Sequence, residues 1–584
     1  MKNRHILRLT MLALAIFGLN TGCNKDILEQ EFRTDISPEF FSTPLGIQQG
    51  LGGCYSNLRS LFGTEGFTMS MNAGTDEVIK GRDGNDSFYN YSINPTDGSI
   101  SAIWNQSYQS INNLNGIIEF GAAANLPADT KQTLIAEAKF LRAFYYFLLV
   151  QNFGDVSLSK GFINQPTVAS SRAPKAEVYQ FIVENLTQAI DELPAKPKDS
   201  AGHASKAAAM FLLSKVYLTR GWSDAAASND FDNAIAMADQ LIANGASLGY
   251  DPAGLRLWNN FSEIFAEGNE YLGESIWVID RLQDNVYGES GFGNTGGLDK
   301  ENRLNYFWRP LYTNTVDINF GTGAAANLVS VMDRDVVNGR PFLRFRPTDY
   351  TLNVAFSAAN RVNDSRYDAS FQTAWIFNRT ATVTSSRGTL VTGVDTALWM
   401  PGVEVSNEVR QSFKGAIIAP SQYSNIFWPS LNKHDDRTRQ HFNDASDRPI
   451  IMMRLAEVYL IAAEAAFKNG NLQKAADYIN VLRRRAANRP GLSMATAEAR
   501  YEAIRVNPGQ ITIDFLMDER TREMYGESVR WLDLVRTKTL KGRIQQYNSI
   551  SAAGFQDFHY LRPIPQSQIN LVTEGPQYPQ NPGY

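Results

Sequence analysis

Residues 454–478, RLAEVYLIAAEAAFKNGNLQKAADY, describe two helices joined by a short turn. Small and aromatic side chains recur at helical spacing on both sides of Gly470, which interrupts the pattern. These side chains are Ala456, Tyr459, Ala463, Ala466, Ala475, Ala476 and Tyr478. Small residues spaced in this way let antiparallel helices approach closely, so the stretch predicts a tightly packed helical pair.

This pair is similar to a tetratricopeptide unit, which repeats about every 34 residues. A second and weaker helical pair is indicated by Ala207, Leu212, Ala234 and Ala238. Such units cannot bury their apolar faces alone and must stack on neighbours. We therefore predict a mostly α fold, a tetratricopeptide-like helical solenoid split across the chain by a large irregular insertion with short strands.

The chain divides by composition into helical and irregular parts. Helical periodicity is strong mainly in residues 101–243 and 449–541, whereas Gly, Asn, Ser and Thr rise and periodicity fades mainly in residues 245–448. Two segments of the irregular part are predicted as short strands, 275–280 and 389–394. We expect residues 39–584 to form a single body, in which the helices are the scaffold and residues 245–448 carry the ligand-binding region.

Composition excludes several classes of protein. The 584 residues carry a formal net charge of −5, and the absence of a basic excess argues against a dedicated nucleic-acid binder. A hydrophobic content of 43% with 20% charged residues rules out wholesale disorder. The two cysteines, Cys23 and Cys54, are too few for a disulfide scaffold, and we predict that Cys54 is a buried free thiol.

The N-terminus has the pattern of a secretory signal. Positive charges precede the apolar stretch 9–19, which is too short to span a bilayer as a helix. Small residues before Cys23 resemble a bacterial lipobox, although Leu19 stands four positions before the cysteine rather than three. We predict a signal peptide over residues 1–22, lipid attachment at Cys23 and a lipidated tether over residues 23–38. The alternative is an ordinary cleavage site with a cysteine nearby.

Two short matches to catalytic motifs lack the flanking structure that the motifs need. Residues 245–249, GASLG, match GxSxG, but a helical segment precedes them, so we interpret them as the end of a helix. Residues 291–296, GFGNTG, match GxGxxG without an adjoining strand and long helix, which indicates a loop. Histidines are few, and neither a P-loop nor HExxH is present. We therefore predict no enzyme activity, no cofactor and no metal.

Five segments between the first helical region and the C-terminus combine into one pattern. They are EAKFLRAFYYF at 137–147, NFGDV at 152–156, RLAEVYL at 454–460, RWLDLVR at 530–536 and QNPGY at 580–584. In sequence and in order, these segments resemble the SusD/RagB family of outer-membrane nutrient-binding lipoproteins. The resemblance covers both ends of the chain, and the middle diverges.

The resemblance implies a lipoprotein anchored in the cell outer membrane and facing outside. Such a protein binds oligosaccharide or polysaccharide, delivers it to a SusC-like TonB-dependent transporter as the transporter's lid, and has no enzymatic activity or nucleic-acid partner. Two alternatives stay open. One is a binder of peptide or another non-glycan nutrient with the same lid role, and the other, less favoured, is a glycan-active enzyme.

A glycan site needs aromatic planes for the apolar faces of sugar rings and fixed polar groups for the hydroxyls. Two segments combine both kinds of residue, 76–91 and 305–312, the second together with Tyr287. The acid at Asp76 also matches a family pattern near the site. The predicted glycan-binding candidates are Asp76, Arg82, Tyr89, Tyr91, Tyr287, Asn305, Tyr306, Trp308 and Tyr312. For each aromatic residue, packing in the local core is the alternative.

Other charged residues within apolar helices are interpreted as structural. Buried charges must be paired, so we predict ion pairs inside the solenoid. The residues concerned are Arg142, Glu464, Glu519, Arg520, Glu523, Arg530 and Asp533. We also expect Trp104 and Trp531 to pack between helices rather than to hold a ligand.

Overall fold

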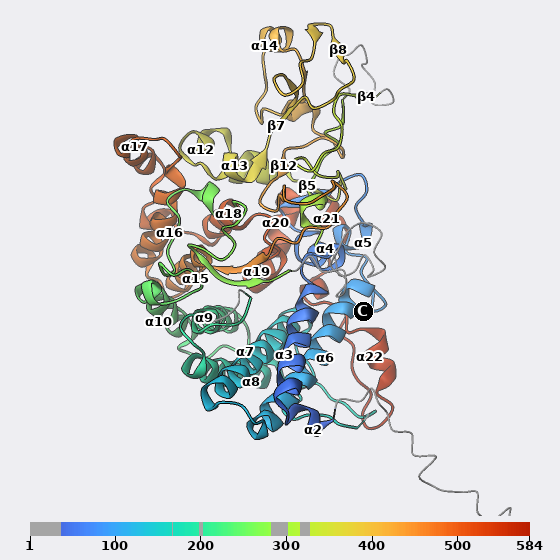
Figure 1. Cartoon of the computed structure of the whole chain (residues 1–584), viewed down its shortest axis with the longest axis vertical. Coiled ribbons are helices and arrows are strands. Elements are labelled where there is room, and N and C mark those ends of the chain that lie inside the picture. Colours follow the sequence, from blue (N-terminus) through green and yellow to red (C-terminus); the bar gives the residue numbers. More distant parts are fainter. Residues whose placement is uncertain (1–36, 166, 198–201, 282–301, 316–327) are drawn as a thin grey trace, which may run out of the picture.

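The computed structural model describes residues 37–584 except 166, 198–201, 282–301 and 316–327. The body is mostly helical with short strands, which confirms the predicted fold class (Figure 1). The signal peptide, Cys23 and nearly all of the tether lie outside the described residues, as do Tyr287 and the GFGNTG segment. Among the helices that are described, none combines the length and apolar character needed to cross a membrane.

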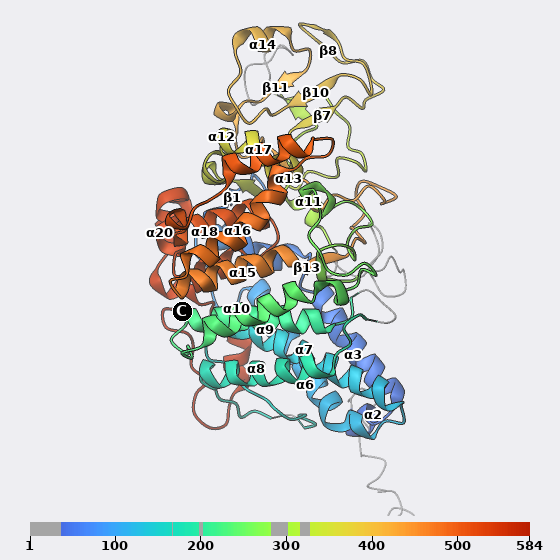
Figure 2. The same ribbon diagram turned by 90° about the vertical axis from the view of Figure 1, so that its left-hand side faces the viewer.

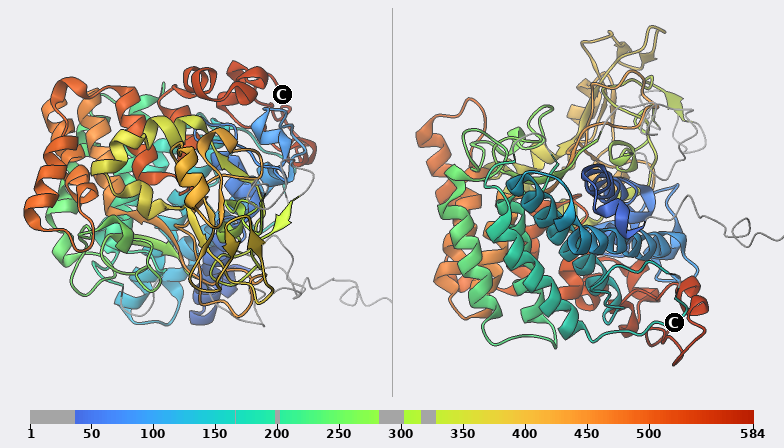
Figure 3. Two further views of the ribbon diagram at one scale, coloured as in Figure 1. Left: turned by 90° about the horizontal axis from the view of Figure 1, so that it is seen from above. Right: turned by 60° about the horizontal axis from the view of Figure 1, so that its bottom comes forward.

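The scaffold is a succession of helices, each in contact with the next, from α6 to α17. The bounds of its first half are α6 Gly98–Phe120, α7 Ala128–Phe153, α8 Lys175–Glu192, α9 Lys206–Trp222 and α10 Asp230–Ala243. Its second half consists of α15 Leu455–Lys468, α16 Leu472–Ala487 and α17 Met494–Ile504. Because α10 packs directly on α15, the solenoid continues across the insertion, as Figures 2 and 3 show.

Gly470 makes the turn of the predicted helical pair. It adopts a φ of 74°, in the left-handed region that glycine enters without steric cost. The alanines on the facing sides of α15 and α16 are buried, so the two helix backbones pack closely around small side chains. The tetratricopeptide-like pair is therefore present where the sequence indicates it.

The two ends of the insertion are held together by a pair of strands. β2 (Ser275–Ile279) runs antiparallel to β13 (Ile450–Arg454), with Ile450 opposite Ile279 and Arg454 opposite Ser275. The predicted strand at 275–280 is thus confirmed. The predicted strand at 389–394 is wrong beyond its first residue, because β9 ends at Thr389 and Gly393 turns the chain with a φ of 75°.

The insertion carries its own hydrophobic core and short strands, and part of it projects from the scaffold (Figure 1). Buried side chains of this second core include Tyr312, Trp375, Leu398, Ile418 and Trp428. The strands are β3 Asn314–Thr315, β4 Val329–Ser330, β5 Phe345–Pro347, β6 Phe371–Gln372, β7 Ala374–Ile376, β8 Thr384–Ser385, β9 Gly388–Thr389, β10 Thr396–Trp399, β11 Ala416–Ile417 and β12 Ser430–Leu431. The short helices are α11 Leu304–Phe307, α12 Ala358–Asn363, α13 Arg366–Ser370 and α14 Asn407–Ser412.

Helices from both chain ends complete the body. The N-terminal elements are α2 Pro38–Phe41, α3 Pro44–Arg59, α4 Glu65–Asn72, β1 Val78–Lys80 and α5 Asp86–Tyr89. The C-terminal helices are α18 Ile513–Met524, α19 Arg530–Arg536, α20 Leu540–Tyr547, α21 Ser549–Gly554 and α22 Gln566–Leu571. α19 contacts α4 and α7, so the C-terminal region closes back onto the N-terminal half.

Both tryptophans assigned to packing are buried between elements. Trp104 meets Phe153 edge to face at 5.0 Å, and the guanidinium of Arg562 lies 3.8 Å from the centre of the Trp531 ring. Cys54 is a buried free thiol that contacts the carbonyl of Ser110. These predictions are confirmed.

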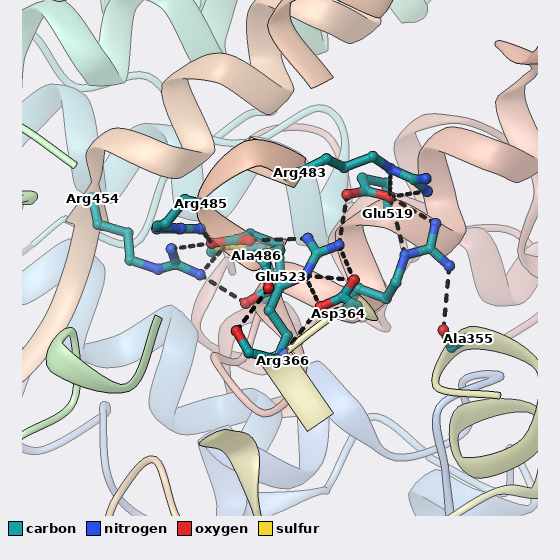
Figure 4. A network of polar contacts seen from close by, with 12 residues as sticks. Ala355, Asp364, Arg366, Arg454, Arg483, Arg485, Ala486, Glu519 and Glu523 are labelled. Atoms are coloured by element: carbon teal, nitrogen blue, oxygen red, sulfur yellow. Dashed lines mark hydrogen bonds and ion pairs between the residues drawn. The ribbon is translucent and has the colours of Figure 1, made fainter. Parts of the chain in front are cut away.

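A network of buried charges joins the insertion to the scaffold (Figure 4). Arg366 of the insertion contacts Glu519 at 2.9 Å and Glu523 at 3.1 Å on α18, and it also pairs with its neighbour Asp364. Burial alone would raise the pKa of Glu523, but Arg485, Arg454 and Arg366 outweigh burial and hold the pKa well below its ordinary value. Glu523 therefore stays ionised inside the protein.

The predicted ion pairs are confirmed with one exception. Glu464 pairs with Arg536, Asp533 with Arg520 and Arg536, and Arg530 with Asp76. Arg142 has no carboxylate partner among the described residues and donates instead to the amide oxygens of Asn115 and Asn185 at 2.7–3.0 Å. Burial accordingly lowers the pKa of Arg142 to about 10.

Candidate functional site

The structure brings the two segments predicted to bind glycan together. β1, within segment 76–91, pairs antiparallel with β5, and the amide of Asp83 donates to the carbonyl of Leu343 at 3.1 Å. On the other side, the amide of Arg344 donates to the carbonyl of Phe307 at 3.0 Å. Residues 340–347 therefore lie between segments 76–91 and 305–312 and join them.

The aromatic rings of these segments point into the core, however. Tyr89, Tyr91 and Tyr312 are buried, and their hydroxyls donate to backbone carbonyls at 2.6–2.8 Å. Tyr312 also stacks on Trp375 with an angle of 2° between the ring planes. Core packing, the alternative considered from the sequence, describes these three residues, because none presents a ring face to a ligand in the structure.

The 305–308 stretch is buried in the same way. Trp308 is 1% exposed and packs against Phe345 and Tyr525. Tyr306 is also buried, and its hydroxyl contacts the carbonyl of Asp444 and the guanidinium of Arg439. Asn305 is buried beneath them. The prediction of an exposed aromatic platform at these positions is corrected by their burial.

Asp76 has a structural role instead of facing a ligand. Its carboxylate is fully buried and accepts from Arg530 of α19 at 2.6 and 2.8 Å and from Arg543 of α20. Burial would raise the pKa of Asp76, but Arg530 and Arg543 lower it below the ordinary value. The ion pairs thus join the N-terminal segment to the C-terminal helices. Arg82, by contrast, is exposed and pairs with Asp83 at 2.8 Å.

Phe342 is the aromatic residue that is partly exposed where residues 340–347 join the two segments, and it is not among the predicted site residues. Its ring is half-buried and packs against Tyr306 at 5.0 Å and Phe307 at 6.2 Å between ring centres. Three guanidiniums surround the ring, those of Arg303, Arg340 and Arg344, at 5.8, 5.1 and 5.4 Å from its centre. We call Phe342 with these three arginines the Phe342 surface.

The Phe342 surface has the components that a sugar requires. The partly open ring offers an apolar plane, and the guanidiniums are fixed hydrogen-bond donors around it. Arg344 is held by Glu65 at 2.6 Å, and Arg340 reaches the amide oxygen of Asn443 at 3.4 Å. The contact with Glu65 orients Arg344 before any ligand binds, which lowers the entropic cost of binding.

Sequence reasoning did not identify this surface. Residues 340–344 read Arg-Pro-Phe-Leu-Arg, a stretch too short to show a helical or strand period. The chain is not extended here, because Leu343 adopts a φ of 54°, and β5 begins only at Phe345. No local sequence pattern therefore places Arg340, Phe342 and Arg344 together.

Two hollows of the described body lie on the helical scaffold. One of about 440 Å³ is lined by Tyr179, Trp222, Leu532, Arg536 and Tyr560, among other residues. Another of about 280 Å³ is bordered by Glu137 and His203, whose side chains contact each other at 2.7 Å. The first joins aromatic and charged side chains and is the main competitor of the Phe342 surface as a ligand site.

The described residues show no constellation for catalysis by a nucleophile elbow or for metal binding. Gly245–Ser247 form a single 3-10 turn directly after α10, whose C-cap is Asn244, so the GASLG segment follows a helix and not a strand. No group of three or more His, Cys, Asp or Glu side chains in the described part of the chain could hold a metal ion.

Comparison with known proteins identifies the family. The SusD family model matches residues 273–584, and a second model, described as starch-binding associating with outer membrane, matches residues 28–218. The chain belongs to the SusD family. Proteins of this family are non-catalytic binding proteins associated with the outer membrane, so the chain is a binding protein and not an enzyme.

Individual relatives have low sequence identity to this chain but align with most of its length. SusD-like protein P2 of Formosa agariphila is 26% identical over 96% of this chain and 97% of its own length. Starch-binding protein SusD of Bacteroides thetaiotaomicron is 24% identical over 77% of this chain and 72% of its own. Among solved structures, a laminarin-binding SusD-like protein has a TM-score of 0.64 and 23% identity, with 92% of this chain and 99% of that one covered. The structural likeness shows a shared fold.

Proposed function

We propose that this protein captures oligosaccharide or polysaccharide at the outer face of the cell and delivers it to a SusC-like TonB-dependent transporter as the transporter's lid. A lipid on Cys23 would hold it in the outer membrane. Membership of the SusD family supports the proposal, as do relatives named for starch and laminarin binding. The signal-like N-terminus with a cysteine after small residues supports the anchor.

The observation that carries glycan binding is the Phe342 surface. It combines a half-buried aromatic ring with oriented donors, at the junction where segments 76–91 and 305–312 meet. A sugar ring stacked on Phe342 would bury apolar area on both partners, and its hydroxyls would accept from the guanidiniums. The neighbouring loop-rich part of the body is the kind of region that carries binding residues on a rigid scaffold.

The way in which the insertion is attached supports the lid role. β2 and β13 join its two ends, and Arg366 contacts Glu519 and Glu523 of the scaffold inside the protein. Breaking such buried pairs is costly, so the insertion and the scaffold should move as one body. A tether at Cys23 and a transporter beneath would then let the whole body open and close over a captured glycan.

The test is glycan binding by the full chain purified in detergent, with affinity electrophoresis as a screen and calorimetry as the measurement. Phe342→Ala should weaken binding about tenfold or more, since an aromatic contact with a ring contributes about 1 kcal/mol beyond burial. Phe467→Ala, a half-buried phenylalanine of the scaffold, is the matched control and should bind normally. Equal affinity of Phe342→Ala and wild type would remove Phe342 from the site. Failure of the wild type to bind any glycan would favour a non-glycan nutrient.

A further inference from the structure

Four arginines lie close together at and beside the Phe342 surface. Arg303, Arg340 and Arg344 surround one ring, and Arg334 adds a fourth charge close by. The pKa of Arg340 is lowered by partial burial and then by the charges of Arg334, Arg303 and Arg344. Four positive charges thus lie close together in a protein whose formal net charge is −5.

The carboxylates near this surface are engaged with other partners. Glu65 pairs with Arg344, and Asp83 pairs with Arg82. Asp335 accepts from Asn338 and Asn378 at 2.6–3.0 Å, Asp333 pairs with Arg379, and Asp444 accepts from the amide of His441. Within the described part of the chain, no carboxylate lies within ion-pair distance of Arg340 or Arg334.

This arrangement is suited to an anionic ligand. Like charges held close together repel, and a bound anion removes that repulsion. The planar fork of a guanidinium matches the oxygens of a carboxylate or a sulfate and donates two parallel hydrogen bonds to either. Phe342 at the centre supplies the apolar plane for the sugar ring that bears the charged group.

We propose that the Phe342 surface selects anionic glycans, whose sugars carry carboxylate or sulfate groups, and that Arg340 makes the principal contact with the charged group. The proposal rests on the proposed glycan-binding function and specifies its ligand class. Arg340 is placed for this role because its one hydrogen-bond acceptor within the described residues is the amide of Asn443, at the long distance of 3.4 Å.

Matched pairs of polysaccharides test the charge preference directly. Polygalacturonate is compared with its methyl-esterified form, and dextran sulfate with dextran, so that each pair differs in charge on a shared backbone. The full chain in detergent should bind at least one anionic member about tenfold more tightly than its neutral counterpart, with affinity that falls as ionic strength rises. The first pair reports on carboxylate and the second on sulfate.

Variants then locate the preference. Arg340→Ala should lose about tenfold in affinity for the anionic member and little for a neutral one, and Arg340→Lys, which keeps the charge but not the fork, should lie between. Arg505→Ala removes an exposed arginine of the scaffold, 3.7 Å from Glu502, and should bind as wild type does. An unchanged thermal midpoint for Arg340→Ala shows that the fold is intact.

The outcomes separate this proposal from the proposed function. Binding of neutral glycans as tightly as anionic ones overturns the charge preference and leaves glycan capture in place. Equal losses in Arg340→Ala and Arg505→Ala show general attraction to polyanions and also overturn it. Binding to no glycan of either kind overturns both.

Discussion

The protein places arginines in two contrasting settings, the buried network around Arg366 and the Phe342 surface. In the network, Arg366, Arg454 and Arg485 meet Glu519, Glu523 and other carboxylates inside the protein (Figure 4). At the Phe342 surface, guanidiniums surround an aromatic ring, and Arg340 has no carboxylate partner among the described residues. The same residue type therefore stabilises the fold where its charge is matched and remains available to a ligand where it is not.

The largest expected effect comes from removing Arg366, whose charge is paired with buried carboxylates. Arg366→Met leaves Asp364, Glu519 and Glu523 with less positive charge around them in a fully buried place. We expect a loss of about 3–5 kcal/mol in the free energy of unfolding, measured by urea denaturation. Arg340→Met is the control, because Arg340 has no carboxylate partner among the described residues. This substitution should lower the free energy of unfolding by less than about 0.5 kcal/mol. Equal losses would contradict the comparison.

A smaller effect is expected at Asp76, which the sequence assigned to the glycan site. Asp76→Asn keeps the shape but removes the charge that Arg530 and Arg543 contact, so unfolding should become easier by about 2–3 kcal/mol at neutral pH. Because Arg530 and Arg543 lower the pKa of Asp76 in the folded protein, its stabilisation is present above the ordinary value of 3.8 and is lost as pH falls through the lowered pKa. The gap between wild type and Asp76→Asn should therefore shrink below about pH 4.

Glycan affinity separates the two interpretations of Asp76. If the residue is structural, the folded variant binds glycan as the wild type does, at neutral pH and at a temperature where both are folded. A selective loss of affinity with an unchanged free energy of unfolding would return Asp76 to the binding site.

The smallest effect is expected at Arg82, whose charge is paired with a carboxylate at the protein surface. Arg82 pairs with Asp83 in a solvent-exposed position, and exposed pairs contribute little to stability. Arg82→Ala should change the free energy of unfolding by less than about 0.5 kcal/mol and glycan affinity by less than about twofold. A loss of affinity as large as that of Arg340→Ala would extend the binding surface toward residues 76–91.

Periodicity explains which parts of the structure could be predicted. The scaffold helices repeat apolar and small residues every three to four positions, so their existence, the turn at Gly470 and the charges that must pair within them follow from the sequence. Arg142 was the exception, because the amide oxygens of Asn115 and Asn185 accept its hydrogen bonds in place of a carboxylate.

The insertion lacks such a period, so its aromatic residues could not be assigned to core or surface. Trp308 and Tyr312 have polar neighbours in sequence yet enter hydrophobic cores formed by distant segments. Phe342 stands among similar residues and stays half-buried, with three guanidiniums around its ring. These contacts join segments far apart in the chain, and no local pattern encodes them.

The most direct test of the account is a crystal structure of the protein with a bound acidic oligosaccharide, such as an oligogalacturonate. The account predicts a sugar ring stacked on Phe342, with its carboxylate within hydrogen-bond distance of Arg340. A sugar bound in another place, such as the scaffold pocket lined by Trp222 and Tyr560, with the Phe342 surface empty, would contradict it.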